Sequence, residues 1–415
     1  MTAHRVTPEQ IREVTDALAA HGGNQSRAAQ ALGLHRSTFM NRLHAADRLA
    51  IPRPAPAPPP PLTDPQHRLA DRVRELETEL KFASRNLVDA EYIKRKVIGL
   101  TEVATESEPP KWLKRPTKAF SGPGVPTLFA SDWHWGEIVD PKQIGGVNEF
   151  NMAIAHERAR TMVEVAIDLL RNHINCESDY PGIVFALGGD MVSGGIHPEL
   201  VATDEREIMP VVVDLFGVLA WCIEHLAGEF GRVFVPCVSG NHGRSTEKIR
   251  NKGRNFTSFD WLVYQFLAKR FESDHRVAFL IPDGPDALYG VMGHRYLLTH
   301  GDNLGKGGDG IIGAIGPIIR GDHRKRSRNA QIDMGYQTLI CGHYHQLIQL
   351  ERVIVNGSLK GMCEYAYTNN FGFEVPRQAL WLTHPSRGIT FSAPVNVDRS
   401  PKKVDAGDSW VTWKA

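Results

Sequence analysis

The sequence predicts an α/β domain, or a layered α-β-β-α domain, that follows a small helical module and a proline-rich linker. The first observation is that short apolar runs rich in β-branched and aromatic residues recur after residue 120, with helical stretches between several of them. The second is a proline run at residues 51–62, and the third is the helical spacing of apolar residues in the first 50 positions.

Length and composition place the chain among ordinary globular proteins. Its 415 residues suffice for two or three domains, and its formal net charge of +1 indicates no particular partner. The five cysteines are scattered and include no C-x-x-C pair, which fits a reducing compartment better than a disulfide framework. Because we find neither a signal peptide nor an apolar run of about 20 residues, we expect a cytoplasmic protein with no membrane partner.

Residues 1–50 are expected to form three short helices. In "PEQIREVTDALAAHGG", Ile11, Val14 and Leu18 recur at helical spacing before two glycines. "NQSRAAQALGL" predicts a second helix that is broken at Gly33, and "HRSTFMNRLH" predicts a third. We therefore expect a compact helical module at the N-terminus.

Residues 51–63 and 64–98 are expected to connect this module to the rest of the chain. "IPRPAPAPPPPL" contains seven prolines, which favour a stiff, extended linker over a helix or a central strand. From residue 69 to residue 90, apolar residues alternate steps of four and three, which is a heptad pattern. This pattern fits either one amphipathic helix lying on the next domain or a coiled coil that makes a homo-oligomer.

The main domain is predicted at residues 120–395, before a C-terminal tail at 396–415. We expect strands at residues 126–130, 183–187, 233–238, 296–299, 338–340 and 352–355. We expect helices at residues 149–171, 205–229 and 256–272. Alternating strands and helices followed by a strand-rich end are typical of an α/β fold.

Nearly every predicted strand is followed directly by residues that can bind a metal. The clearest example is "CGHYHQ" at residues 341–346, where two histidines two positions apart follow the apolar run "YQTLI". Since ligands gather beyond the carboxyl ends of strands in open α/β sheets, we expect these side chains to meet at one rim. The candidates in chain order are Asp132, His134, Asp190, Asn241, His242, His300, His343 and His345.

The donor types favour one class of metal site. Carboxylates and imidazoles without thiolates suit Mn, Fe, Zn, Co or Ni and disfavour a structural cysteine–zinc site. A carboxylate can bridge two cations, and a neutral asparagine oxygen completes a ligand shell without adding charge. Gly189, Gly240 and Gly342 stand beside the candidates and permit sharp turns directly after a strand.

This set of motifs resembles the calcineurin-like metallophosphoesterase superfamily, whose motifs read D-x-H, G-D, G-N-H, H and G-H-x-H in that order. All five blocks are present over residues 127–345, and "VNGSL" at residues 355–359 resembles the family's strand after the last motif. The resemblance implies a four-layer α-β-β-α sandwich and two divalent metal ions, with Mn as the first choice. It implies that one metal is held by Asp132, His134, Asp190 and His345, and the second by Asp190, Asn241, His300 and His343.

By the same resemblance, His242 is a catalytic histidine that faces the substrate and binds no metal. Two positions depart from the family pattern. Ser193 stands where the family often has a second Asp after G-D, and Gly243 stands where it often has Asp or Glu after G-N-H. Neither departure removes a ligand, but the second leaves the partner that orients His242 unidentified.

The resemblance implies phosphoester hydrolysis, in which a metal-bound hydroxide attacks phosphorus and His242 stabilises the developing charge or protonates the leaving oxygen. It does not choose a substrate, because the superfamily includes protein phosphatases, nucleotidases and nucleases. "HGDNLGKGGDG" at residues 300–310 lacks the Walker A spacing, and is either a mobile loop or a lid whose Lys306 meets a substrate phosphate. His197 is either a rim residue that lines the substrate or a surface histidine.

The N-terminal module resembles a Fis-type helix-turn-helix, with paired alanines in the second helix and L-G-L at the turn. The resemblance implies that the third helix reads the major groove of DNA. The expected DNA contacts are Arg36, Ser37, Thr38, Asn41 and Arg42. The alternative is a small helical bundle that docks a protein.

A basic cluster, "RGDHRKRSR" at residues 320–328, is either a solvated loop or a contact to a nucleic-acid backbone through Arg324, Lys325 and Arg326. These features favour a nuclease that its N-terminal module tethers to DNA, and the order of parts resembles phage- or prophage-encoded proteins. One alternative is a phosphomonoesterase or cyclic-nucleotide phosphodiesterase that this module only localises. The other is a DNA-binding regulator whose phosphoesterase domain senses a ligand.

Overall fold

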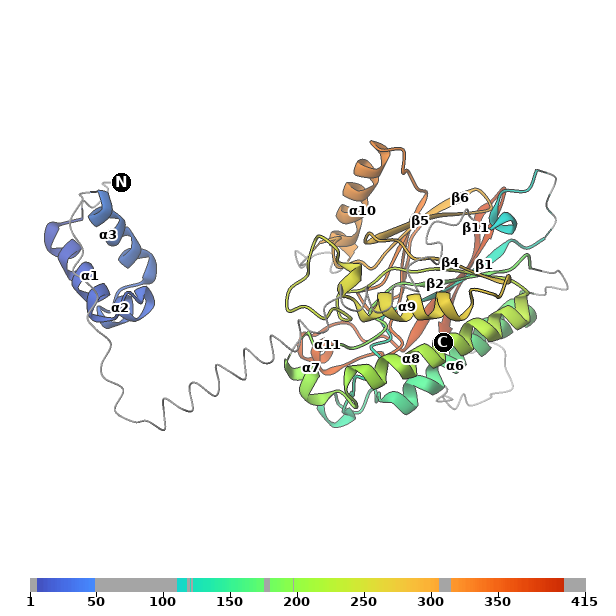
Figure 1. Ribbon diagram of the computed structural model, residues 1–415, viewed down its shortest axis with the longest axis horizontal. Coiled ribbons are helices and arrows are strands. Elements are labelled where there is room, and N and C mark those ends of the chain that lie inside the picture. The colour runs from blue at the N-terminus through green and yellow to red at the C-terminus, as the bar shows by residue number, and fades with distance from the viewer. Residues whose placement is uncertain are drawn as a thin grey trace, which may run out of the picture. The chain divides into compact units, whose positions relative to one another are not determined.

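The computed structural model describes residues 6–48, 110–117, 120, 122–174, 180–196, 198–305 and 315–398 (Figure 1). The chain divides into two compact units, one N-terminal and one C-terminal, and each is described by itself. Three predicted features lie outside the described residues: the linker at 51–63, the helix at 64–98 with its heptad seam at 69–90, and the tail beyond residue 398.

Within residues 6–48 the chain forms the three expected helices, α1 (Pro8–Ala20), α2 (Gln25–Ala31) and α3 (Arg36–Arg48). α1 begins with a capping box: Thr7 Oγ1 accepts from the Gln10 N–H at 3.3 Å, and Gln10 Oε1 accepts from the Thr7 N–H at 3.1 Å. All three helices contribute to one apolar core. Its buried members are Val14, Leu18, Ala28, Ala29, Phe39 and Leu43.

The C-terminal unit contains a six-stranded sheet in the order β11-β10-β1-β2-β3-β4. Its parallel strands are β1 (Val125–Ala130), β2 (Ile183–Leu187), β3 (Val233–Pro236) and β4 (Val277–Leu280). Two antiparallel strands extend it, β10 (Arg377–His384) beside β1 and β11 (Gly388–Asn396) beside β10. The sequence patterns predict β1, β2 and β3 but miss β4, β10 and β11. Parallel pairing brings the carboxyl ends of β1, β2 and β3 to one edge.

Three helices cover one face of this sheet: α6 (Met152–Asp168), α8 (Ile208–Phe230) and α9 (Phe259–Arg270) (Figure 1). α6 continues as a short π-helix, Leu169–His173. Their apolar side chains share a core with Leu128 of β1 and Phe185 of β2. These helices confirm the three predicted for this domain, and each begins three residues after its predicted start.

Among the described residues, α8 is the one helix long and apolar enough, by length and composition, to cross a membrane. On those two criteria, the expectation that no apolar run reaches this length is wrong. Half of its most apolar window is buried inside the domain. Leu215, Leu219 and Ile223 lie in the core that α8 shares with the sheet, as in the packed helix of a folded domain.

A second sheet has five strands in the order β5-β6-β7-β9-β8. The strands are β5 (Asp286–Val291), β6 (His294–Thr299), β7 (Thr338–Cys341), β8 (Ile348–Gln349) and β9 (Val353–Val355). β6, β7 and β9 are parallel, so the ends of β6 and β7 lie at a common edge. Side chains of both sheets form one core, among them Phe129 and Val184 of the first sheet and Tyr296 and Ile340 of the second.

α10 (Ile315–Ala330) packs Ile318 against Leu297 and Leu339 of the second sheet. Because neighbouring side chains of a strand point to opposite faces, this cluster lies on the face turned away from the first sheet. Shorter elements complete the unit. They are the 3-10 turns Lys111–Leu113, Pro141–Gln143 and Asn255–Thr257, and the helices α7 (Pro198–Thr203) and α11 (Glu364–Thr368).

The basic cluster at residues 320–328 lies in α10, so the reading of it as a loop is wrong. Gly321 and Pro317 lower the helix propensity of this stretch. Pro317 is tolerated because it lies in the first turn of the helix. Gly321 is required because a Cβ there would approach Leu304 Cβ to 2.6 Å. Tertiary packing therefore overrides the local signal.

Candidate metal centre

Side chains from five strand ends meet in the C-terminal unit. β1 leads to Asp132 and His134, β2 to Asp190, β3 to Asn241 and His242, β6 to His300, and β7 to His343 and His345. Three groups among the described residues could hold a metal ion, each with ligand atoms within 4.8 Å of one another: Asp132–His134–His345, His134–Asp190–His242 and Asp190–His300–His343. Folding thus brings together the side chains that the sequence motifs select.

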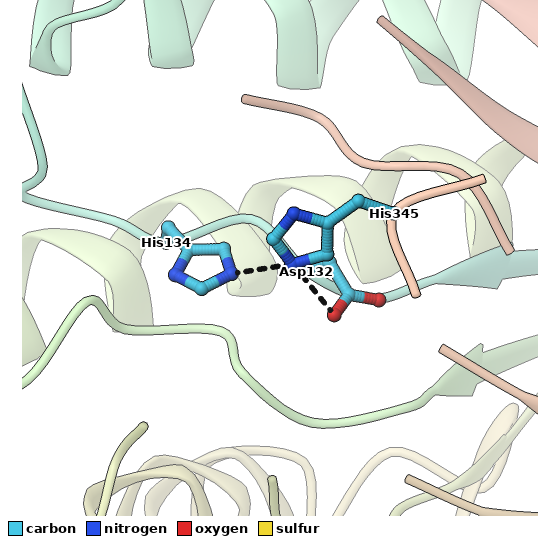
Figure 2. A group of neighbouring side chains, drawn as sticks. All are labelled: Asp132, His134 and His345. Atoms are coloured by element: carbon cyan, nitrogen blue, oxygen red, sulfur yellow. Dashed lines mark hydrogen bonds and ion pairs between the residues drawn. The ribbon is translucent and has the colours of Figure 1, made fainter. Parts of the chain in front are cut away.

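The first group joins the segment after β1 to the segment after β7 (Figure 2). His134 Nε2 lies 3.0 Å from His345 Nε2, which lies 3.4 Å from Asp132 Oδ1. Asp132 and His134 are fully buried, whereas a quarter of the His345 side chain is exposed. Ser131 Oγ donates to Asp132 Oδ2 at 2.5 Å and the His343 N–H donates to Oδ1 at 2.9 Å, so neighbouring groups fix this carboxylate.

The group of Asp190, His300 and His343 shares Asp190 with the group that contains His134 and His242. Asp190 Oδ2 lies 3.0 Å from His300 Nε2, and that nitrogen lies 3.2 Å from Asn241 Oδ1. The rings of His300 and His343 meet edge to face, with 5.2 Å between their centroids. Asp190 therefore lies between the two sets of imidazoles, the position that a bridging carboxylate requires.

Five of the eight candidates have a left-handed backbone, with φ values of 56° (Asp132), 49° (His134), 50° (Asp190), 72° (His343) and 54° (His345). Only three other non-glycine residues in the described part of the chain share this conformation. Each such residue costs about 1–3 kcal/mol, and it persists only where its surroundings impose it. This concentration of strained turns is a signal of function that the sequence does not carry.

Gly240 and Gly342 let the ligand-bearing segments approach more closely than any side chain would permit. A Cβ atom at Gly240 would overlap the Asp190 carboxylate, and one at Gly342 would overlap the Asp132 carboxylate. The glycines next to the motifs therefore serve close contact between segments as well as turn formation.

The tautomers of two histidines direct lone pairs toward a cation site. His300 Nδ1 must donate to the Gly188 carbonyl, 2.9 Å away, because a carbonyl only accepts; Nε2 of the neutral ring then carries the lone pair. His134 Nδ1 faces Glu137 Oε2 at 3.4 Å, which leaves its Nε2 for the centre. Metal-binding histidines have this arrangement, and a donor set of imidazole, carboxylate and amide fits divalent ions such as Mn²⁺.

Burial and neighbouring charges set the protonation of the centre. Burial lowers the pKa of His134 well below its ordinary value and lowers the pKa of His343 to about 4. Burial acts in the same direction on His300, but attraction to Asp190 outweighs it and raises the pKa of His300 to about 10. Burial would raise the pKa of Asp190, but the imidazoles, His300 foremost, hold it well below its ordinary value. A cation bound beside Asp190 would therefore displace a proton from His300.

His242 has the orienting partner that the sequence left unidentified. Its Nδ1 donates to the Ser193 carbonyl at 3.0 Å, and its backbone N–H donates to Asp190 Oδ1 at 2.6 Å. Burial lowers the pKa of His242, which favours the neutral ring with its lone pair on Nε2. The ring stands edge to face with His134, 4.5 Å between centroids.

Two acids that the sequence motifs do not include lie beside the two departures from the family pattern. A Cβ at Gly243 would lie 3.0 Å from Asp260 Oδ1, and the buried Asp260 carboxylate accepts the Asp190 N–H at 3.0 Å. Asp204 Oδ1 accepts from Ser193 Oγ at 3.0 Å. Burial raises the pKa of Asp260 to about 6 and that of Asp204 to about 7. Asp260 lies on α9 and Asp204 follows α7, so no local motif could find them.

A buried ion pair behind His134 is likewise absent from the sequence prediction. Lys360 Nζ lies 2.8 and 2.9 Å from the two carboxylate oxygens of Glu137, and both side chains are nearly inaccessible to solvent. Burial alone would lower the pKa of Lys360, but attraction to Glu137 outweighs it and raises that pKa. The Glu137 carboxylate thus lies between the Lys360 ammonium group and His134 Nδ1, which is 3.4 Å from its Oε2. Lys360 follows "VNGSL" directly, but nothing local indicates its partner.

The cations predicted to line a substrate path have partners inside the domain. Lys325 Nζ lies 2.7 Å from Asp286 Oδ1 and is nearly buried, and Arg326 Nη2 lies 3.1 Å from Asp322 Oδ2. Arg324 Nη2 donates to a backbone carbonyl at 2.6 Å. The contacts of Lys325 and Arg324 attach α10 to its own domain, whereas the Arg326–Asp322 pair lies within α10. The other two predicted substrate-lining residues, His197 and Lys306, lie outside the described residues.

In the N-terminal unit, α3 exposes most of the residues expected to contact DNA. Arg36, Ser37, Thr38 and Asn41 are exposed. Arg42 is half-buried, and its Nη1 lies 3.4 Å from Glu13 Oε2 of α1. Four of the five expected contact residues are thus accessible on the surface of α3.

Comparison with known proteins bears mainly on the N-terminal unit. No curated protein matches the chain. Among solved structures, the chain is similar to "Termus thermophilus Sulfate thiohydrolase SoxB in complex with glycerol", with 10% identity, a TM-score of 0.26, and coverage of 69% of this chain and 59% of that chain. The chain spans less than two thirds of the length of that protein. Residues 12–53 match the family described as "Bacterial regulatory protein, Fis family", which confirms the expected Fis-type helix-turn-helix, a DNA-binding module.

Proposed function

We propose that the C-terminal unit is a dinuclear-metal-dependent phosphodiesterase of the calcineurin-like metallophosphoesterase type. The observation that carries this proposal is the position of Asp190, whose carboxylate falls both in a group with His134 and His242 and in a group with His300 and His343. When bound on either side of this carboxylate, two cations would clamp a phosphoryl group for in-line displacement.

The arrangement of cores supports a four-layer α-β-β-α sandwich. One apolar core joins α6, α8 and α9 to the first sheet, a second joins the two sheets, and a third joins the second sheet to α10. In such a sandwich the ligands follow the carboxyl ends of the central strands, and the candidate ligands of this chain directly follow β1, β2, β3, β6 and β7.

The proposed ligands are those implied by the motif order, and Mn²⁺ is the proposed metal. One site comprises Asp132, His134, Asp190 and His345, and the other comprises Asp190, Asn241, His300 and His343. When bound, the two cations would activate water for attack on phosphorus and neutralise the phosphoryl oxygens.

The chain's own residues would position the substrate and move one proton. Because Nδ1 of His242 donates to the Ser193 carbonyl, proton exchange with the substrate would occur at Nε2. When the ring is protonated, Nε2 would donate its proton to the leaving oxygen of the substrate. Arg244 Nη1 donates to the Asn241 carbonyl at 2.6 Å, so its guanidinium lies at the edge of the centre and would attract a phosphate.

The proposed substrate is DNA, because the same chain carries a Fis-type helix-turn-helix. Tethering a phosphodiesterase to duplex DNA raises its effective concentration at that polymer. We accordingly propose a cytoplasmic nuclease, directed to DNA through Arg36, Ser37, Thr38, Asn41 and Arg42.

The test offers the purified protein, with Mn²⁺, bis-p-nitrophenyl phosphate, p-nitrophenyl phosphate, and linear, nicked and single-stranded DNA. Asp190→Ala or His343→Ala should abolish turnover and lower the bound metal measured by elemental analysis. Turnover that survives either substitution, with metal content unchanged, contradicts the assignment.

The substrate preference separates the alternatives. Hydrolysis of the monoester alone would favour a phosphomonoesterase, and DNA binding without any turnover would favour a regulator. DNA cleavage that weakens in Arg36→Ala, while bis-p-nitrophenyl phosphate turnover is retained, supports the tethered nuclease.

A further inference from the structure

The most exposed aromatic side chains of the described residues lie together in one short segment. They are Tyr365 (70% exposed), Phe373 (58%), Tyr367 (48%) and Phe371 (48%), and we call them the aromatic rim. Exposed apolar side chains are normally scattered, so four rings within nine positions mark a contact surface. The rings of Tyr365 and Phe371 meet edge to face, 5.8 Å between centroids.

Both ends of the aromatic rim are tied to segments that carry proposed ligands. Before the rim, Glu364 Oε1 accepts from the Asp140 N–H at 2.7 Å, in the loop that follows His134. After it, Glu374 Oε1 accepts from the Leu347 N–H at 2.7 Å, two residues beyond His345. The rim therefore borders the group formed by Asp132, His134 and His345.

A basic loop begins two residues after His242 and three residues after Asn241, a proposed ligand of the second metal site. Residues 244–254 contain five basic residues and one acidic residue. Arg244 donates to Asn241, and Arg254 pairs with both oxygens of Asp302, two residues after His300, at 2.9 and 3.0 Å. Lys248, Arg250 and Lys252 are exposed, and no carboxylate of the described residues lies within ion-pair distance of them. We call these last three the cationic loop.

The centre is thus bordered by stacking surfaces next to one ligand group and by cations next to the other. Suppose that one phosphodiester of a DNA strand is held at the centre. Phosphates of the strand on one side of it would then lie near the cationic loop, and bases on the other side would lie near the aromatic rim. Aromatic side chains stack on unpaired bases, whereas the bases of a duplex are stacked on one another and offer no free face. Electrostatic attraction to the backbone is needed in both cases.

We propose that the aromatic rim and the cationic loop bind single-stranded DNA and that the substrate of the centre is an unpaired strand. This inference rests on the proposed phosphodiesterase function. It assigns separate targets to the two units: the helix-turn-helix binds duplex DNA, and the centre takes a strand that is locally unpaired, such as a tail or a gap beside that duplex.

The experiment measures fluorescence anisotropy of labelled oligo-dT, of an abasic strand of equal charge, and of a duplex, using the full-length protein in EDTA. Phe371→Ala combined with Phe373→Ala should weaken oligo-dT binding by at least about fivefold for each ring that stacks. Phe371→Leu combined with Phe373→Leu keeps much of the apolar surface but removes the rings, so it should weaken binding as well. Val213→Ala, at a comparably exposed site on α8 (68%), should bind as the unmodified protein does.

The abasic strand isolates the contribution of the bases. It should bind the unmodified protein more weakly than oligo-dT does, and the rim variants should not change its affinity. Replacing both Lys248 and Lys252 by neutral residues should make the plot of log affinity for oligo-dT against log salt concentration less steep. Its slope should fall by about 0.7 for each phosphate that is no longer neutralised. Duplex binding should fall in Arg36→Ala and should be unaffected by the rim variants.

Two results overturn the inference alone: rim variants that bind oligo-dT as tightly as the unmodified protein, or an abasic strand that binds as tightly as oligo-dT. In both cases turnover of bis-p-nitrophenyl phosphate with Mn²⁺ by the unmodified protein would leave the phosphodiesterase proposal standing. If that ester is not turned over at all, the proposed function fails and the inference fails with it. Circular dichroism of each variant identifies any loss of folding.

Discussion

Replacing Lys360 by Met should destabilise the C-terminal unit severely, although Lys360 touches no proposed substrate. Its ammonium group is the close cationic partner of Glu137, at 2.8 and 2.9 Å, and both residues are buried. The substitution keeps the aliphatic stem but leaves the Glu137 carboxylate without its partner. The main chain should stay in place, because the Lys360 carbonyl accepts from Arg158 Nη1 at 2.7 Å and from Asn148 Nδ2 at 2.9 Å.

The expected magnitude follows from the burial of both charges. Removing one member of a buried ion pair costs about 3–5 kcal/mol, because the remaining charge is neither paired nor hydrated. For a domain of this size, each kcal/mol shifts the melting temperature by about 2–4 °C, so Lys360→Met should melt roughly 10 °C lower. The double substitution Lys360→Met with Glu137→Gln removes both charges, and its cost should fall below the sum of the single costs by about 1–3 kcal/mol.

The assay is urea unfolding monitored by tryptophan fluorescence. All eight tryptophans lie after residue 110, so the signal reports on the C-terminal unit and not on the helix-turn-helix. The matched control is Lys269→Met, because Lys269 pairs with Glu272 at 2.6 Å but the two side chains are 44% and 52% exposed. That substitution should cost less than about 1 kcal/mol. Equal costs for Lys360→Met and Lys269→Met, or strictly additive costs in the double variant, would refute the reasoning.

Four further outcomes are expected. Asp260→Asn turns an amide N–H toward backbone donors such as the Asp190 N–H, and should lower Mn²⁺ affinity about 10- to 100-fold in a titration; unchanged affinity would argue against Asp260 positioning the centre. Because the folded pKa of Asp204 is raised from 3.8 to about 7, its protonated form contributes stability below about pH 4 that is lost as pH rises toward 7; Asp204→Asn should flatten this loss in urea midpoints by about 1 kcal/mol after allowance for solvent screening, and an equally steep profile would contradict it. Arg36→Ala, which removes an exposed cation, should weaken duplex binding and lower its salt slope by about 1, more than Arg42→Ala does, since Arg42 already has Glu13 nearby; the reverse order in an anisotropy titration would count against α3 as the recognition helix. Mn²⁺ at about 100 times its dissociation constant should stabilise the C-terminal unit by about 2.7 kcal/mol, and EDTA should reverse the gain in the melting curve; an unchanged melting temperature would show that no ion binds the folded centre.

The sequence by itself identified the residues that meet at the candidate centre. Short apolar runs indicate where β1, β2, β3, β6 and β7 end, and the residues just after them are visible as Asp, Asn and His. Adjacent positions carry this information because a strand and the turn after it are local features. The spacing of the two histidines in "CGHYHQ" and the paired alanines of the helix-turn-helix are likewise local, so the order of residues alone reveals both.

The tertiary structure alone decided which distant groups support those residues. Asp260 reaches Asp190 from α9, Asp204 reaches Ser193, and Lys360 reaches Glu137 across 223 positions. Periodicity describes neighbours up to about four residues apart, and it is silent on such contacts because strand pairing and helix packing set them. The same reason explains α10, whose Gly321 disfavours a helix locally yet permits its contact with Leu304. Local residue types thus choose the donors, and long-range packing sets their distances, charges and strained backbone.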